Sequence, residues 1–514
     1  MAEKSFIVRS AHLPESKEQA PGHDTVDAAQ SIESAGCDEG YFTEAKSALE
    51  SEDDDSSATS SDSSAAWEQE PFTSFQHKVK RLFLKAFPGY GFADIRVDSI
   101  KGGSFNRVIG VTILEPHRFT VRWLQQRMRA CIGLHVETRS EQYVVRIPRF
   151  DTEVEKMIDD IAALQFASFR LQLPVPVLIH FEVFAANAIN SPYTIQTRLP
   201  GLHLSSLRLN LEQRKSLLRN VMEVQRQLNS VTNTSAGNIT IATSSIAEVQ
   251  LYQFEIPKSR PDLAPLPKYA ATPCQSTFDL LKELCNRWKE LYGLHNIMVD
   301  IIWNRVDIII SSLREHGFLP DTDQFYFCHT DFVGHNILVE LRGDTDVDIT
   351  AVLDWDSEWV FFAPKFVAYR APLWLWNDMY DHGTYETKAL LTPVDSDEEE
   401  LKRTFEELAD EEWLRYAFAP EFVVARRLFE ILRSGAPGSE HWDEAKDIFK
   451  TWQEMYPETE GLVDDDSLYA DSEPVSDSDG DPCSGSSSDE EYSEDENIGA
   501  EAKDSVMQSE PEIV

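Results

Sequence analysis

The sequence predicts a two-lobed α+β fold in which a small β-rich lobe precedes a larger, mostly helical lobe. Three observations support this prediction. Residues 95–197 contain several short apolar runs of strand length and one helical segment. From Asn210 onward the apolar residues recur at helical spacing, interrupted by one short strand pair. Both ends of the chain are acidic and poor in apolar residues. A β-rich half followed by a helix-rich half is typical of α+β proteins.

The two ends differ in composition from the centre. Seventeen acids and four bases lie in residues 1–70, and 18 acids and one base lie in residues 463–514. Such segments bury too little apolar surface to offset the entropy of ordering. We therefore predict a disordered acidic tail at 1–70, a nucleotide-binding N-lobe at 71–199, a C-lobe with catalytic loop and acceptor site at 200–462, and a disordered Ser-rich acidic tail at 463–514.

Charge and cysteine content limit the partners and the compartment. The formal net charge of the chain is −42. This acidity argues against nucleic acid as a partner, because binding a phosphate backbone requires a basic protein surface. No apolar run is long enough to span a membrane, and Met1 to Arg9 lacks an apolar signal core. The six cysteines show no paired spacing for zinc or a disulfide framework. These features predict a cytoplasmic protein, with a nuclear location left open and with tails that solubilise the chain or bind proteins.

The elements of the N-lobe follow from apolar spacing and turn residues. Pro174-Val175-Pro176 ends the second helix of this lobe, because proline cannot continue a helix. Glu115–Thr138 is an apparent insert. In chain order the pattern predicts a helix at Phe72–Phe87, strands at Ile95–Ile100, Arg107–Leu114 and Tyr143–Ile147, a helix at Asp151–Leu171, and strands at Val177–Glu182 and Tyr193–Thr197.

The C-lobe is predicted from longer helical patterns with one embedded strand pair. A Pro-rich connector, Pro257–Pro273, separates the first two helices. We predict helices at Leu211–Val231, Phe278–Tyr292 and Ile297–His316, strands at Phe325–His329, Ile337–Leu341 and Thr350–Leu353, and helices from there to about Tyr456.

The strongest chemical signal lies on this embedded strand pair. His329 and Asp331 form a His-x-Asp motif, Asn336 follows Asp331 by five residues, and Asp354 ends a later apolar strand. A phosphotransferase needs a carboxylate to orient the attacking hydroxyl, and an amide and a second carboxylate to hold magnesium against the phosphates. This is the spacing of a kinase catalytic loop. The alternative is that these residues only cap turns between strands. Two motifs in the correct order favour the chemical interpretation.

The double motif resembles the aminoglycoside phosphotransferase and choline-kinase-like phosphotransferase enzyme family, in its fungal branch of uncharacterised substrate. The resemblance implies a protein-kinase-like bilobal fold that uses ATP and Mg²⁺. It implies that Asp331 is the catalytic base, that His329 braces the loop, and that Asn336 and Asp354 bind the metal. The second motif reads Leu353-Asp354-Trp355-Asp356, so Asp356 stands where the family usually has Glu. Asp356 is a further candidate for a role at the metal.

A second signal is the segment between the first two predicted strands. Gly102 and Gly103 let the backbone approach a phosphate closely, and the Ser104 hydroxyl can donate to it. The family resemblance makes this segment, with Asn106, the loop that covers the nucleotide. Taken by itself, the same segment is also an ordinary hairpin turn.

The remaining nucleotide-binding candidates lie on the predicted strands and helix of the N-lobe. A kinase fold needs a cation on the third strand to contact the phosphates, and Arg146 stands where lysine is usual. Asp160 is the helical acid predicted to pair with it. The resemblance places the backbone of Gln196 to Arg198 at the adenine edge. The alternatives without a function are an exposed arginine at Arg146, a solvated helix face at Asp160, and an edge strand at Gln196 to Arg198.

Together these residues predict transfer of the γ-phosphate of ATP to a hydroxyl of a small molecule. Two alternatives stay open. An atypical protein kinase would phosphorylate peptides instead of a metabolite. A kinase-like binding scaffold without activity would use its tails to recruit partners. Arg146 and Asp160 favour the scaffold slightly, whereas Asp331, Asn336 and Asp354 favour an enzyme.

Overall fold

A computed structural model describes the chain at residues 69–100, 102–114, 140–241, 249–255, 270–292, 297–319, 324–377, 386–435 and 439–462. Both predicted tails, Lys101, the predicted insert and most of the Pro-rich connector lie outside these residues. Within them, no helix combines the length and the apolar character needed to cross a membrane.

The N-lobe is an antiparallel sheet with a helix on one face. Its five strands are β1 (Ile95–Ser99), β2 (Asn106–Leu114), β3 (Ser140–Pro148), β4 (Leu178–Glu182) and β5 (Tyr193–Thr197), in the order β1-β2-β3-β5-β4. The amphipathic helix α2 (Phe72–Ala86) buries Phe75, Val79, Leu82 and Phe83 against this sheet, which makes a separate hydrophobic core. Each of these elements lies close to its predicted range.

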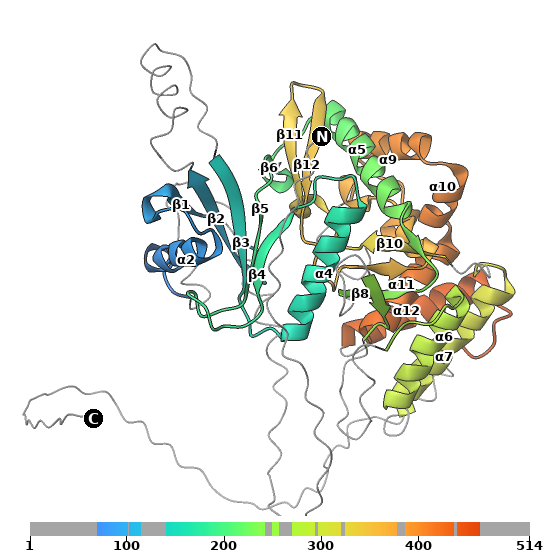
Figure 1. Ribbon diagram of the computed structural model, residues 1–514. Coiled ribbons are helices and arrows are strands. Elements are labelled where there is room, and N and C mark those ends of the chain that lie inside the picture. The colour runs from blue at the N-terminus through green and yellow to red at the C-terminus, as the bar shows by residue number, and fades with distance from the viewer. Residues whose placement is uncertain are drawn as a thin grey trace, which may run out of the picture. The chain divides into compact units, whose positions relative to one another are not determined.

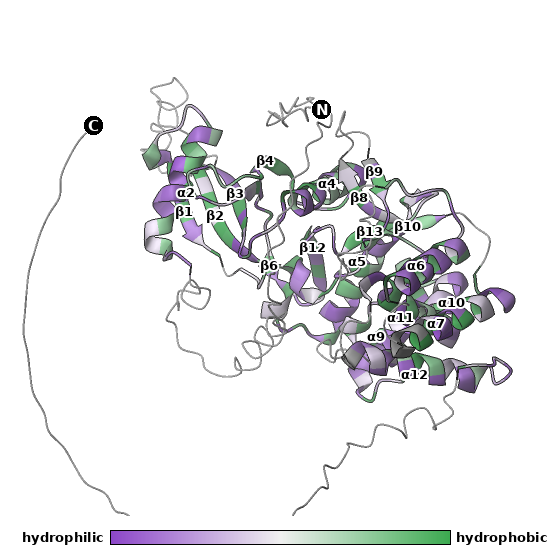
Figure 2. Cartoon of the chain, turned by 90° about the horizontal axis from the view of Figure 1, so that it is seen from below, coloured by the Kyte–Doolittle hydropathy of each residue, from purple (hydrophilic) through white to green (hydrophobic). Residues whose placement is uncertain are grey.

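The C-lobe has a larger core covered by helices (Figure 1). Figure 2 shows hydrophilic and hydrophobic residues on the same helices of this lobe, as expected for helices with one face on a core. Among the described residues, its α-helices are α5 (Leu211–Asn229), α6 (Thr277–Tyr292), α7 (Ile297–Glu315), α8 (Lys365–Ala368), α9 (Ser396–Leu408), α10 (Glu411–Phe418), α11 (Pro420–Ser434) and α12 (Ser439–Met455). Two cores and two element types confirm the predicted two-lobed α+β class.

Two small sheets carry the predicted catalytic strands. The order of one sheet is β7-β10-β13-β8-β9, and that of the other is β12-β11-β6. Their strands are β6 (Leu202–His203), β7 (Thr232–Asn233), β8 (Gly237–Ile241), β9 (Val249–Tyr252), β10 (Phe325–His329), β11 (Ile337–Arg342), β12 (Asp346–Val352) and β13 (Val360–Ala363). The loop from β10 to β11 therefore runs from one sheet to the other.

The strands β7, β8 and β9 lie between Val231 and Pro257, where no element was predicted. The prediction of helices from Leu353 to about Tyr456 missed the strand β13. All four residues of β13 are buried, so they show no alternation of apolar and polar positions. A short, fully apolar run cannot be distinguished from a buried helical turn by its period. These strands are defined by pairing across the sheet instead.

Helix α4 (Val154–Arg170) connects the two lobes. Figure 1 shows α4 between the N-lobe sheet and the sheet that contains β8 and β10. Its residue Asp159 is only 3% exposed and accepts hydrogen bonds from Thr240 Oγ1 on β8 at 2.8 Å and from Tyr252 Oη on β9 at 2.9 Å. Burial raises the pKa of Asp159 to about 6, although these two hydrogen bonds oppose the shift. The helix is thereby fixed to the C-lobe by a buried acid.

We expect Asp159 to make stability depend on pH. A carboxyl group with a raised pKa in the folded state stabilises that state at low pH, and this stabilisation is lost as pH rises through about 6. Urea unfolding of Asp159→Asn should therefore show a smaller loss of unfolding free energy than wild type between about pH 4 and about pH 7. Glu155→Gln, an exposed position on the same helix, serves as the control. Identical pH profiles for Asp159→Asn and wild type would contradict the assignment.

Candidate active site

The loop after β10 begins with a buried histidine. His329 is 4% exposed, and its Nε2 donates to the carbonyl oxygen of Leu353 at 3.0 Å. Burial lowers the pKa of His329 to about 4, so the ring is neutral at physiological pH. His329 thus connects the start of one motif to the residue before Asp354 and does not face the cleft as a base.

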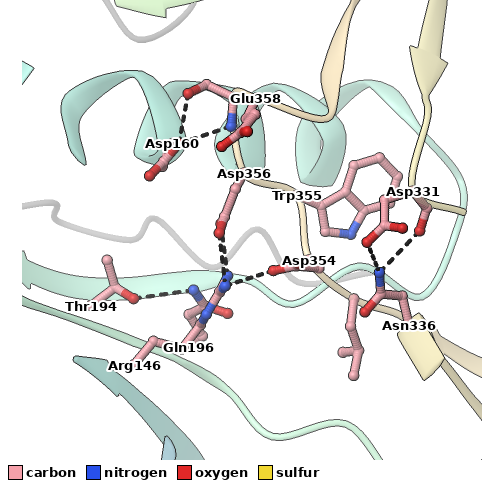
Figure 3. Close-up of polar contacts among 12 residues, drawn as sticks. Arg146, Asp160, Thr194, Gln196, Asp331, Asn336, Asp354, Trp355, Asp356 and Glu358 are labelled. Carbon is pink, nitrogen blue, oxygen red and sulfur yellow. Dashed lines mark hydrogen bonds and ion pairs between the residues drawn. The ribbon is translucent and has the colours of Figure 1, made fainter. Parts of the chain in front are cut away.

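Asn336 fixes the side chain of Asp331. Its Nδ2 donates to the Asp331 carbonyl oxygen at 2.9 Å and to Asp331 Oδ2 at 2.6 Å (Figure 3). The backbone N–H of Leu353 donates to the Asn336 carbonyl oxygen at 2.8 Å. This network directs Nδ2 of Asn336 toward Asp331, and it leaves the amide oxygen Oδ1 as the group that can bind a cation.

Asp354 lies just after β12, in an unusual backbone conformation. Its φ is +62°, in the left-handed region that side chains other than glycine rarely adopt. Within the described residues, only Asn190 and Asp354 combine a side chain with a positive φ. The adjacent Trp355 is buried, and its Nε1 donates to the Val352 carbonyl oxygen at 2.8 Å. The buried indole and the turn together hold Asp354 toward the N-lobe. Strain of this kind is common at functional sites.

Arg146 on β3 reaches across the cleft to both acids of the second motif. Its Nη2 lies 2.6 Å from Asp354 Oδ1, and Nη1 and Nη2 each lie 2.9 Å from one oxygen of Asp356 (Figure 3). Burial lowers the pKa of Arg146, but the negative charges of Asp356 and Asp354 raise it by more. Arg146 is therefore a fixed cation at the position where the sequence predicted one.

The helical acid Asp160 does not pair with Arg146 in this structure. Its Oδ1 instead accepts from the backbone N–H of Ser357 at 2.8 Å and from Ser357 Oγ at 2.6 Å. Burial, together with the nearby charge of Asp356, raises the pKa of Asp160. The predicted Arg146–Asp160 pair is thus replaced by an Arg146–Asp356 pair. The shorter aspartate on the helix reaches the loop, whereas the arginine reaches the acid on that loop.

A cavity of about 350 Å³ lies at this place. The predicted residues that line it are Asn106, Arg146, Asp160, Gln196, Asp354 and Asp356. Its lining does not include Gly102, Gly103, Ser104, Arg198, His329, Asp331 or Asn336. Phe105 and Phe150, 67% and 57% exposed, lie at its edge. The structure therefore brings residues from the loop, the third strand, the helix and the second motif to one cavity.

The predicted phosphate loop forms a tight turn between β1 and β2. A Cβ atom on Gly102 would lie 2.6 Å from the carbonyl oxygen of Asn106, so only glycine fits there without a shift. The carbonyl oxygen of Gly103 accepts from Arg149 Nε at 3.0 Å, and the Arg149 backbone N–H donates to the Phe105 carbonyl oxygen at 2.9 Å. The end of β3 thus supports this loop.

The predicted adenine contacts divide into two groups. Gln196 is 6% exposed, and its Nε2 donates to Thr194 Oγ1 at 3.1 Å beside the cavity. The backbone N–H of Arg198 donates to the Gln142 carbonyl oxygen, and its side chain pairs with Asp98 at 2.9 Å. The side chain of Gln196 thus faces the cavity, whereas Arg198 is engaged within the N-lobe sheet.

Two residues near Asp331 were given no role by the sequence. The side chain of His335 is half exposed, and its Nε2 lies 3.5 Å from Asp331 Oδ2. This contact raises the pKa of His335, and burial opposes the shift. Arg370 donates to the carbonyl oxygen of Thr330 and so supports the loop from behind. The position of His335 next to Asn336 was a usable signal, whereas the contact of Arg370 depends on the fold alone.

Comparisons with known proteins find a family match over part of the chain. Residues 134–357 match the phosphotransferase enzyme family. A search of curated proteins found no match. Among solved structures, a thermostable mutant of aminoglycoside phosphotransferase APH(4)-Ia in complex with AMP-PNP and hygromycin B is 15% identical, with a TM-score of 0.41, and the alignment covers 73% of this chain and 99% of that one. The GDP and kanamycin complex of APH(2")-IIIa is 11% identical, with a TM-score of 0.36, and the alignment covers 73% of this chain and 98% of that one.

The family match covers β3, α4, the catalytic loop and the second motif. It therefore includes Arg146, Asp331, Asn336 and Asp354. The predicted resemblance to a phosphotransferase family and the predicted enzyme class, a kinase-like phosphotransferase, are confirmed for this region. The fungal branch stays a prediction. The individual roles of these residues stay predictions.

The backbone of Asp354 leads to a prediction about stability. Asparagine tolerates a left-handed φ better than alanine does, because its short polar side chain bonds locally. Asp354→Ala should therefore be about 1 kcal/mol less stable than Asp354→Asn, although both variants lose the charge. Urea unfolding measures this difference. The same two substitutions at Asp348, which lies on β12 without a positive φ, are the control and should differ less. Equal stability of the two Asp354 variants would contradict a strained backbone at this position.

Proposed function

We propose that this chain, whose residues 134–357 match the phosphotransferase enzyme family, transfers the γ-phosphate of ATP to a hydroxyl group of a small molecule with the help of Mg²⁺. The observation that carries the proposal is the contact of Arg146 with Asp354 at 2.6 Å, at a cavity that Phe105 and Asn106 also line. A cation and a metal-binding carboxylate at one cavity are what a nucleotide triphosphate requires.

The donor atoms fit a magnesium ion. The Asp354 carboxylate and the Asn336 amide oxygen are hard oxygen ligands from two adjacent loops. Among the described residues, no group of three His, Cys, Asp or Glu side chains could hold a metal by itself. Mg²⁺ is usually bound by one or two protein oxygens together with phosphates and water, so a small protein contribution is expected. When bound, the ion would neutralise charge on the transferring phosphate.

Asp331 is the residue we assign to the acceptor hydroxyl. Its Oδ2 accepts from Asn336 Nδ2, so Oδ1 is the oxygen that would orient the hydroxyl and take its proton. Asn336 would thereby have two functions, because its Nδ2 orients Asp331 while its Oδ1 is left to hold the metal. Such catalysis depends mainly on positioning and on charge neutralisation, and rigid side chains favour both.

The phosphates would meet Arg146, and Gln196 would contact the base of the nucleotide. Arginine can bind phosphate through two parallel hydrogen bonds, which lysine cannot do. Gly102, Gly103, Ser104 and Asn106 would cover the phosphates from the N-lobe. A small-molecule acceptor is favoured because the double motif resembles that of small-molecule kinases. The C-lobe helices would form the acceptor site.

A non-catalytic scaffold is the second candidate. Arg146 already pairs with both acids of the second motif, and this arrangement would also stabilise a site that binds no nucleotide. The enzyme is favoured because Asp331, Asn336 and Asp354 all retain donor atoms suited to catalysis.

Magnesium-dependent nucleotide binding is the first test. ATP with Mg²⁺ should raise the melting temperature of the wild-type chain, and this rise should be weaker in Asp354→Asn because a metal ligand is lost. Asp331→Asn should retain the rise, since Asp331 contacts the acceptor and not the nucleotide. Thermal shift with and without EDTA measures the effect. If no variant and no wild-type sample responds, although all are folded, the scaffold becomes the leading function.

Activity separates the base from the metal ligand. Once a metabolite screen supplies an acceptor, Asp331→Asn should lower kcat by a factor of about 10²–10⁴, the usual contribution of general base catalysis. KM for ATP should change little. A coupled ADP-release assay measures both constants. Asp344→Asn, on the turn between β11 and β12, is the control. An Asp331→Asn enzyme with normal kcat would show that another group takes the proton.

A further inference from the structure

The geometry assigns a distinct role to Asp356, which we propose is the positioning residue for Arg146 and not a ligand of the metal. In this assignment Asp160 acts one step further away, by holding the backbone that carries Asp356. The inference rests on the proposed function, because it divides the two acids of the second motif between the nucleotide phosphates and the metal.

The hydrogen-bond pattern distinguishes the two acids. Arg146 Nη1 and Nη2 each lie 2.9 Å from a separate oxygen of Asp356, so the pair is bidentate. Asp354 receives one hydrogen bond, from Nη2 to its Oδ1 at 2.6 Å. A planar guanidinium and a carboxylate joined by two parallel bonds have a fixed relative orientation, whereas a single bond allows rotation. Asp356 therefore sets the direction of the guanidinium.

The surroundings of Asp356 hold it in place from both sides. Before it, the buried indole of Trp355 is bonded to the Val352 carbonyl oxygen. After it, Ser357 is 5% exposed and donates both its backbone N–H and its hydroxyl to Asp160 Oδ1. Figure 3 shows this series from the helix, through Asp160 and Asp356, to Arg146. The helical acid thus acts through the loop backbone, and the pair with the arginine is made by the loop acid.

The two acids differ in the number of carboxylate oxygens that Arg146 leaves available to bind a metal. Both oxygens of Asp356 already accept from Arg146, whereas Asp354 engages Arg146 through Oδ1 alone. A divalent ion at Asp356 would compete with Arg146 for both carboxylate oxygens, whereas Asp354 leaves Oδ2 outside its contact with Arg146. We expect nucleotide phosphates to replace the single bond to Asp354 while Arg146 keeps its bidentate pair.

The test separates nucleotide affinity from metal affinity in the full chain. Calorimetric titration with AMP-PNP, in EDTA and with excess Mg²⁺, measures the nucleotide affinity. A Mg²⁺ titration at fixed AMP-PNP measures the metal affinity. Asp356→Asn should weaken AMP-PNP by about 10-fold or more under both conditions, because Arg146 loses a charge-assisted pair. The Mg²⁺ concentration for half-saturation should stay unchanged. Asp354→Asn should raise the Mg²⁺ concentration for half-saturation and leave the AMP-PNP affinity in EDTA nearly unchanged.

Three further variants control the result. Asp348→Asn breaks the exposed Arg342–Asp348 pair on the β11–β12 hairpin, with Nε 2.8 Å from the carboxylate, and should alter neither quantity. Arg146→Gln combined with Asp356→Asn should bind AMP-PNP no more weakly than Arg146→Gln alone, because the pair acts as a unit. Asp356→Glu, which keeps the charge, should retain part of the affinity and serves where the asparagine variant does not fold.

The outcomes that overturn the assignment are distinct. A Mg²⁺ requirement that rises in Asp356→Asn as it does in Asp354→Asn would make Asp356 a metal ligand. The losses of AMP-PNP affinity caused by Arg146→Gln and Asp356→Asn could instead add up in the double variant, while those of Arg146→Gln and Asp160→Asn do not. That result would assign the positioning role to Asp160 on the helix. Absence of AMP-PNP binding by the wild-type chain would overturn the proposed function itself, and this inference with it.

Discussion

The ion pair of Arg146 with Asp354 and Asp356 is the interaction on which the arrangement of the site depends. Three acids, Asp160, Asp354 and Asp356, lie close together at the cleft, and their mutual repulsion is unfavourable away from bulk water. Arg146 pairs directly with Asp354 and Asp356, and it comes from the opposite lobe. The same contact therefore offsets part of the negative charge and fixes β3 of the N-lobe against the C-lobe loop.

Helix α4 extends this connection. Two adjacent acids on one helix, Asp159 and Asp160, bond to different parts of the C-lobe, one to β8 and β9 and the other to Ser357. A helix held at both contacts is attached to the C-lobe, although it follows an N-lobe strand in the chain. The buried hydrogen bonds of Asp159 and the pairing of Arg146 thus act together, since each fixes one side of the same cleft.

The N-lobe elements could be predicted from the sequence because their signals are local. Apolar alternation, a helical period and the Pro-rich break after α4 indicate each element within a few residues of its bounds. The strands β7, β8, β9 and β13 could not be predicted in this way. They are short, and β13 is apolar throughout, so their conformation is set by pairing with residues far away in the sequence.

The sequence by itself predicted the candidate catalytic and metal-binding residues, because His329, Asp331, Asn336 and Asp354 form a motif whose spacing is fixed by one loop and one hairpin. The tertiary structure alone decided which acid pairs with Arg146, which side chains face the cavity, and how His335 and Arg370 contact the loop. These contacts join segments up to 210 residues apart. The local sequence does not predict whether Asp160 or Asp356 lies within hydrogen-bond distance of Arg146, because that distance depends on how the two lobes and helix α4 pack.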